Sequence, residues 1–178
     1  MLLHCLQIGS PQYNPFPLFS PWSFTFIGEY DSTILCEAIT RTGLTDALDS
    51  GEWTVFAPTN EAFERSLSSS DAAELSEDTD LLREILLYHT IEDQVVPEAD
   101  LPCVEGENLI TMTNGKDVRS LCKLREPTWL KGAGNICKER DRIITSRTER
   151  WCTASPQIIS TDVEVCNGIV HVLDGVLL

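Results

Sequence analysis

Two Asn-Gly dipeptides constrain the fold of this chain more than any other feature. Asn114-Gly115 separates residues 109–113 from 116–118, and Asn167-Gly168 separates 161–165 from 169–173, all runs rich in branched residues. Asn-Gly is the preferred pair for the two-residue turn that joins antiparallel strands. Each dipeptide therefore predicts a β-hairpin, and the second half of the chain is expected to consist mostly of strands.

The first half has helical spacing instead. Apolar residues fall on one face from Ser32 to the turn at Gly43, and again from Thr79 to Leu87. Residues 66–80 are rich in Ser, Asp and Glu and lack the spacing of a calcium loop, so they predict a solvated, loosely helical surface. Helices early and strands late predict an α+β fold.

A strand joins these helical regions. Residues 53–57 are rich in aromatic and branched side chains, and Pro58 closes the strand. Thr59 or Asn60 can then accept a hydrogen bond from the free amides of the next helix, so we expect Asn60 to have a structural role.

Cysteine content indicates an oxidising compartment. The chain has seven cysteines and no CxxC pair, which favours disulfides over zinc, with free buried thiols as the alternative. Closure of a loop of about fifteen residues predicts a bridge between Cys137 and Cys152. A second pairing, Cys103 with Cys122, is expected because the Asn114-Gly115 hairpin brings their flanks together.

Charge is distributed unevenly. The net charge of −15 disfavours nucleic-acid binding. Ten basic residues nevertheless lie between Lys116 and Arg150 against five acidic ones, which leaves three basic and 23 acidic residues elsewhere. This cationic segment either folds onto its own acidic domain or binds in trans, to a second copy or an acidic polysaccharide. Candidate contact residues are Arg140, Arg142, Arg147 and Arg150.

The first 31 residues form a poorly specified leader. They lack a basic start, and the apolar run 11–28 is broken by four prolines and is too short to span a bilayer as a helix. No lipid-anchor pattern ends the chain. The sequence thus predicts no signal peptide or membrane attachment of its own.

Three stretches together resemble the fasciclin family: TVFAPTNEAF at 54–63, the pair Tyr88-His89, and NGIVHVLDGVLL at 167–178. The resemblance implies a β-sandwich or wedge with helices beside it over residues 32–178. It also implies an extracellular or cell-surface setting, and adhesion to matrix, to a protein receptor, to like molecules or to glycans, without catalysis or cofactor. Tyr88 and His89 are candidate receptor contacts. A cysteine-bearing insertion at about 119–156 departs from the family's pattern.

Few residues could support catalysis. A two-residue turn at Asn167-Gly168 would pair Glu164 with His171, so His171 is expected to be structural, and would put four valines on the opposite face in the core. No phosphate loop, metal-binding helix or nucleophile elbow is present. Two alternatives stay open: a secreted hydrolase or redox protein that uses a free cysteine with His89 or His171, and a small-ligand carrier.

Overall fold

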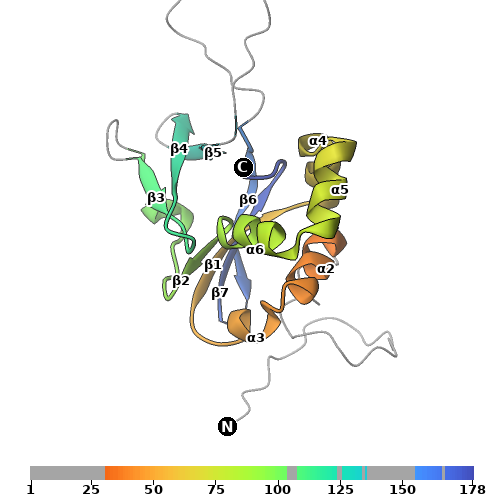
Figure 1. Cartoon of the computed structure of the whole chain (residues 1–178). Coiled ribbons are helices and arrows are strands. Elements are labelled where there is room, and N and C mark those ends of the chain that lie inside the picture. Colours follow the sequence, from red (N-terminus) through yellow and green to blue (C-terminus); the bar gives the residue numbers. More distant parts are fainter. Residues whose placement is uncertain (1–30, 104–107, 124–125, 134, 136–154, 166) are drawn as a thin grey trace, which may run out of the picture.

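A four-stranded sheet lies at the centre of the computed structural model, which describes residues 31–103, 108–123, 126–133, 135, 155–165 and 167–178 (Figure 1). Its strand order is β2-β1-β7-β6, with β1 and β7 parallel and the other pairs antiparallel. The strands are β1 (Trp53–Pro58), β2 (Thr90–Glu92), β6 (Ile158–Val165) and β7 (Gly168–Leu173).

Helices cover one face of this sheet. Apolar helix residues such as Leu35, Phe63 and Leu82 pack with Val170 and Val172 of β7 in one buried cluster, against which Val163 and Val165 also pack. The expected core position is therefore confirmed for Val170 and Val172, whereas Val163 and Val165 are half-buried at the edge of the cluster. The helices are α2 (Thr33–Arg41), α3 (Thr45–Leu48), α4 (Asn60–Ser66), α5 (Ser69–Glu77) and α6 (Thr79–Leu87).

A three-stranded antiparallel sheet of order β3-β4-β5 covers the other face. Its inward residues Val118 and Leu130 pack with Phe56 and Leu173 of the central sheet. Every residue of β1 is buried because that strand has a layer on each side. The elements on this side are the 3-10 helix η1 (Glu98–Asp100), β3 (Leu109–Thr111), β4 (Asp117–Lys123) and β5 (Glu126–Lys131). This is the expected α+β arrangement of sheets with helices beside them.

Thr59 and Asn60 cap different helices. The Thr59 hydroxyl accepts from the Ala62 amide, 3.2 Å away, at the start of α4. Asn60 instead accepts from the Ile34 amide of α2 at 2.9 Å and donates to the side chains of Asp31 and Thr33. Asn60 is therefore structural, as expected, but it holds the start of a helix 26 residues away.

The two Asn-Gly sites behave differently. Gly115 has a φ of 77° in the loop between β3 and β4, which confirms the first hairpin. In the second hairpin Val165 pairs with Gly168, two residues away from Val170, its partner in the predicted register. Gly168 is needed for another reason: a Cβ there would stand 1.9 Å from the carbonyl oxygen of Trp53 in the neighbouring strand.

This register corrects the predicted contact between Glu164 and His171. Glu164 pairs with Ile169 instead of His171 and is exposed. Ile169 and His171 alternate onto the same side of β7, so the two-residue shift keeps Glu164 on the side of His171 but moves it two residues along the strand, and the predicted pair does not form.

The cysteine-bearing segment is partly integral to the fold. Residues 119–123 and 126–131, within the expected insertion, form most of β4 and all of β5. Cys122 of β4 is bonded to Cys103, the second of the two expected pairings, with their Cα atoms 5.6 Å apart. The other pairing, Cys137 with Cys152, lies outside the described residues. Among the described helices, none is long and apolar enough to cross a membrane.

Candidate functional site

Tyr88 lies where α6 ends, at the junction of the helices with both sheets. It is the C-cap residue of α6, and its side chain is only 4% exposed. Its hydroxyl donates to the Asp117 carbonyl at 2.9 Å and accepts from the Ala133 amide at 3.1 Å. Tyr88 thus ties α6 to β4 and to the residues after β5.

His89 follows at the same junction, just before β2. Its Nδ1 lies 2.8 Å from the Ile85 carbonyl, to which it donates, and Nε2 accepts from the Leu177 amide at 2.9 Å. Burial lowers the pKa of His89 to about 4, although the bond to Ile85 opposes the shift. The ring is therefore neutral near pH 7 and both nitrogens are occupied.

These contacts place the predicted receptor pair in the interior. With exposed fractions of 4% and 2%, Tyr88 and His89 present no surface to a partner in this conformation. Their partners join α6, β4 and the last residues of the chain, so the pair connects elements distant in sequence.

Asn135 completes this junction. It donates to the Val176 carbonyl at 3.0 Å, and its Oδ1 accepts from the amides of Gly132 and Leu178 at 3.0 and 3.2 Å. Sequence analysis did not identify Asn135 as a contact of the C-terminal residues, because two of its partners lie more than forty residues along the chain.

His171 is fully buried on the side of the central sheet that faces β3-β4-β5. Its Nε2 lies 2.9 Å from the Val96 carbonyl, and its ring stacks on Phe56 with centroids 5.3 Å apart. Nδ1 lies 3.4 Å from the Asp162 amide and 3.9 Å from the Asp162 carboxylate. Burial lowers the pKa of His171 despite these contacts. The residue is structural, as expected, but its acidic neighbour is Asp162.

Cys36 is the described cysteine without a disulfide partner. Burial, followed by the nearby charge of Glu37, raises the pKa of its thiol to about 11. A nucleophilic cysteine needs the opposite shift. Since His89 and His171 both have their ring nitrogens engaged, the described residues contain no activated cysteine–histidine pair.

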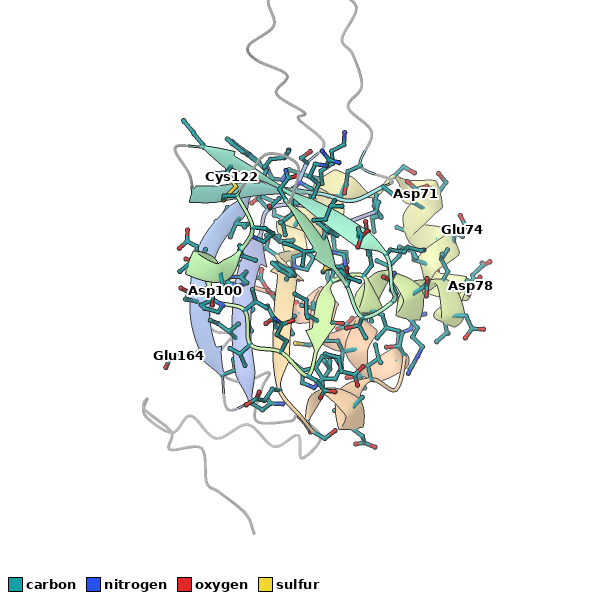
Figure 2. All side chains as sticks on the ribbon, turned by 90° about the vertical axis from the view of Figure 1, so that its left-hand side faces the viewer. Asp71, Glu74, Asp78, Asp100, Cys122 and Glu164 are labelled. Carbon is teal, nitrogen blue, oxygen red and sulfur yellow. A yellow bond between two sulfur atoms is a disulfide. The ribbon has the colours of Figure 1, made fainter. Side chains whose placement is uncertain are left out.

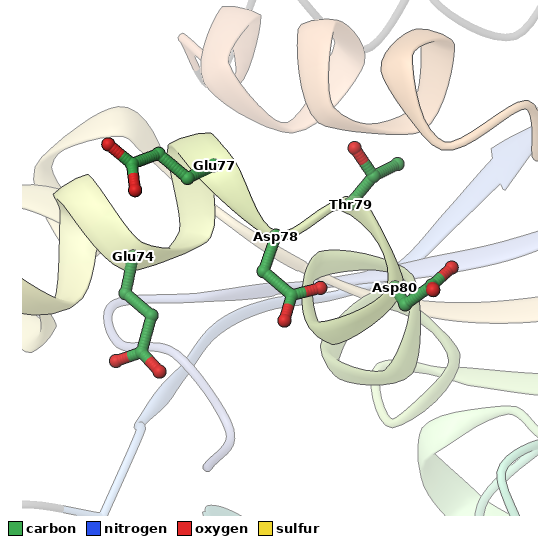
Figure 3. A pocket seen from close by; sticks show the side chains of 5 residues that line it. All are labelled: Glu74, Glu77, Asp78, Thr79 and Asp80. Carbon is green, nitrogen blue, oxygen red and sulfur yellow. The ribbon is translucent and has the colours of Figure 1, made fainter.

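Acidic side chains gather in an open hollow at the junction of α5 and α6, lined by Glu74, Glu77, Asp78, Thr79 and Asp80 (Figure 3). These side chains point in different directions, and Asp78 accepts from the Leu81 amide as the cap of α6. Among the described residues, no group of three or more His, Cys, Asp or Glu side chains could hold a metal ion.

The outward side of the three-stranded sheet carries two cations, Arg119 and Lys131, together with Asp117, whose carboxylate accepts from the Thr111 hydroxyl at 2.8 Å. Arg119 of β4 lies directly opposite Lys131 of β5 on one side and Leu109 of β3 on the other. We call the surface formed by Arg119 and Lys131 the cationic sheet face. Neither cation forms an ion pair with a side chain that the structure describes, although Lys116 at the preceding turn contacts Glu84 at 3.1 Å. Like charges directly opposite one another lower sheet stability.

Acidic residues lie on both sides of the molecule. Figure 2 shows Asp71, Glu74 and Asp78 on the helical side, away from Cys122 of β4, and Asp100 and Glu164 on the side of the sheets. The predicted contact residues Arg140, Arg142, Arg147 and Arg150 lie outside the described residues. The described part of the basic segment thus places two cations on one face of the second sheet, with acidic residues on the side of the helices.

Comparison with known proteins gives a consistent result. The model of the fasciclin domain matches residues 31–178. An uncharacterized protein of Synechocystis is 30% identical over 145 residues, which cover 81% of this chain and 86% of that protein.

Two mycobacterial proteins match over shorter stretches. The cell surface glycolipoprotein MPB83 of Mycobacterium bovis is 35% identical over 94 residues, 53% of this chain. The immunogenic protein MPB70 of the same species is 46% identical over 57 residues, 32% of this chain. These matches span 39% and 29% of the two relatives. Among solved structures, a domain pair of the insect cell adhesion molecule fasciclin I is similar, with a TM-score of 0.46 and 20% identity, over 86% of this chain and 43% of that one.

Proposed function

This chain belongs to the fasciclin domain family, and from that membership we propose that it is a non-catalytic adhesion module at the cell surface or outside the cell. The cell-surface and adhesion proteins among its relatives support this setting. The disulfide between Cys103 and Cys122 supports an oxidising compartment.

The single observation that carries the proposal is the cationic sheet face. Arg119 and Lys131 stand side by side without an acidic partner among the described side chains, an arrangement that lowers the stability of the isolated domain. A negatively charged partner would neutralise both. We therefore propose that this face contributes to adhesion, with Arg140, Arg142, Arg147 and Arg150 adding to the same charge.

The partner we favour is a second copy of the chain. Its helical side carries Asp71, Glu74 and Asp78, so a basic face meeting an acidic side gives a head-to-tail contact. An acidic glycan or a protein receptor is the alternative. Local charges attract within about 8 Å at physiological salt, so association should weaken steeply as salt rises.

Sedimentation across a salt series tests this proposal. The variant Arg119→Gln/Lys131→Gln should lose most of its self-association. Arg65→Gln/Lys116→Gln, which removes two cations that already contact their own domain, should keep it. Equal association of the two variants at every salt concentration would contradict the role of this face. If the native chain does not self-associate but binds a sulfated polysaccharide, and Arg119→Gln/Lys131→Gln loses that binding, the face binds glycans instead.

The predicted arginines need a separate variant. Replacing Arg140, Arg142, Arg147 and Arg150 together by Gln should reduce association while leaving the fold intact. If this variant alone loses association, the adhesive charge lies in that segment rather than on the sheet. If neither basic variant differs from the native chain, the charged surface is not the adhesive element.

A cysteine-dependent enzyme is the competing function, and a thiol assay separates it from adhesion. Cys36 should react slowly with iodoacetamide near neutral pH, because its raised pKa keeps it protonated. Rapid reaction of a single cysteine, lost on substitution of His89 or His171, would favour the enzyme.

A further inference from the structure

An apolar groove on the helical side of the molecule is not explained by the cationic sheet face. It lies between α2, α4 and α5, has a volume of about 410 Å³, and is lined by apolar residues that include Ile34, Ala38, Phe63, Leu67, Ala72 and Leu75, with the charged residues Glu37, Arg41 and Glu64 also in its lining. Ile34 is 37% exposed, a large apolar side chain at the edge of this groove. An engineered apolar cavity of about 150 Å³ holds one benzene ring, so the groove could receive about two aromatic rings.

The chain itself contains a segment that suits this groove. Seven of its 13 aromatic residues lie in the first 30 positions, and the first 28 residues contain no Asp, Glu, Lys or Arg. Pro15, Pro17 and Pro21 oppose helix formation in this region. In an extended conformation alternate side chains share a side, so Trp22, Phe24 and Phe26 would form one aromatic face.

The length of this segment and the reach of the linker that follows it both fit the groove. Trp22 to Phe26 would span about 13 Å when extended, and α2, with its nine residues, is about 13 Å long. The five steps from Phe26 to Asp31 reach at most about 18 Å. Asp31 is fixed beside the groove, because its carbonyl accepts from the Asn60 amide at 2.8 Å at the start of α4.

We propose that the segment Trp22–Phe26 docks in the groove between α2, α4 and α5 of its own chain, with its aromatic face against Ile34, Phe63 and Leu67. A short tether gives the segment an effective concentration in the millimolar range, which favours its own groove over that of a second molecule. Docking would cover apolar surface on the segment and in the groove. Exposed aromatic patches otherwise promote association between molecules.

A photo-crosslinking amino acid at position 24 of the full chain tests the proposal. We expect crosslinks within one molecule to residues that line the groove. Ala72→Glu, which places a charge in the groove, should reduce their yield about tenfold if docking weakens by about 1.4 kcal/mol. Ala73→Glu makes the same change one residue away, at an exposed position outside the groove lining, and should leave the yield unchanged.

Chymotrypsin cleavage gives a second readout. If docking protects Phe24 and Phe26, cleavage after them should accelerate about tenfold in Ala72→Glu and not in Ala73→Glu, since cleavage follows the population of the undocked segment. Crosslinks that join two chains would show that the occupant comes from a second copy. Crosslinks outside the groove, or equal behaviour of the two variants, would overturn the proposal.

Discussion

The two faces of the central sheet are built differently. Toward the helices, β1 and β7 present Trp53, Val55, Ala57, Val170 and Val172, all apolar. Toward the second sheet they present Phe56 and Leu173 together with the polar side chains of Thr54 and His171, and His89 and Asn135 form hydrogen bonds to the C-terminal residues beside this second cluster.

This difference separates two ways of holding layers together. Burial of apolar area is non-directional and fixes the helices on the sheet without specific partners. Buried hydrogen bonds are directional and are costly when one partner is lost. We therefore expect the side toward the second sheet to be the more sensitive to single substitutions and to acid.

The largest expected effect is that of His89→Ala. The change leaves the Leu177 amide unpaired in a buried site, removes one of two hydrogen bonds to the Ile85 carbonyl, which still accepts from the Tyr88 amide at 3.1 Å, and opens a cavity. An unpaired buried group costs about 1 to 3 kcal/mol and the cavity adds to this loss, so the unfolding free energy should fall by roughly 4 kcal/mol. Hydrogen exchange of the Leu177 amide should accelerate more than exchange in α2.

Val172→Ala on the helical face provides the matched control. It should cost about 2 to 3 kcal/mol through lost packing, with no selective loosening of the C-terminal residues. If both substitutions accelerate exchange at Leu177 equally, the two faces do not differ in the way inferred here.

Acid should destabilise the fold through His89. Its pKa is about 4 in the folded chain and about 6.5 when unfolded, so between these values only the unfolded chain binds the proton. Stability should thus fall as pH drops from about 6.5 to about 4, by roughly 3 kcal/mol from this group, and this contribution should level off below. The lowered pKa of His171 acts in the same direction.

Urea unfolding as a function of pH measures this loss. In His89→Gln the fall between about pH 6.5 and about pH 4 should be shallower, because the residue no longer titrates. An unchanged slope would mean that His89 is not buried in its neutral form.

The smallest expected effect is that of Asp162→Asn. Asn tolerates the left-handed backbone of this residue, whose φ is 55°, and its side-chain oxygen can still accept from the Glu98 amide, which donates to the Asp162 carboxylate at 2.8 Å, so the change mainly removes the charge near His171. Because Asp162 is exposed, the cost should be below about 1 kcal/mol. Double-mutant cycles should find coupling between Asp162 and His171 and none between Glu164 and His171. Coupling of Glu164 instead would restore the register predicted from the sequence.

Several elements followed from the sequence because their causes are local. Apolar spacing predicted α6 at Thr79–Leu87, and the Asn114-Gly115 turn predicted the hairpin of β3 and β4. The family and the α+β architecture also followed, since the motifs at 54–63 and 167–178 carry both the core pattern and the resemblance. The roles of Tyr88 and Asn60 could not be read in the same way, because each contacts residues more than 25 positions away.

By itself the sequence determined the main helices, the strand at 53–57 and the existence of two hairpins, but not β5, which lies in the predicted insertion. It also determined the −15 charge and its separation into basic and acidic regions. Tertiary structure decided the register of β6 on β7, where close approach of Gly168 to Trp53 replaced the turn expected from Asn-Gly. It also decided that His89 and His171 are buried, neutral connectors. The physical reason is that local propensity depends on neighbours in the chain, whereas register and burial depend on which distant backbone groups meet inside the fold.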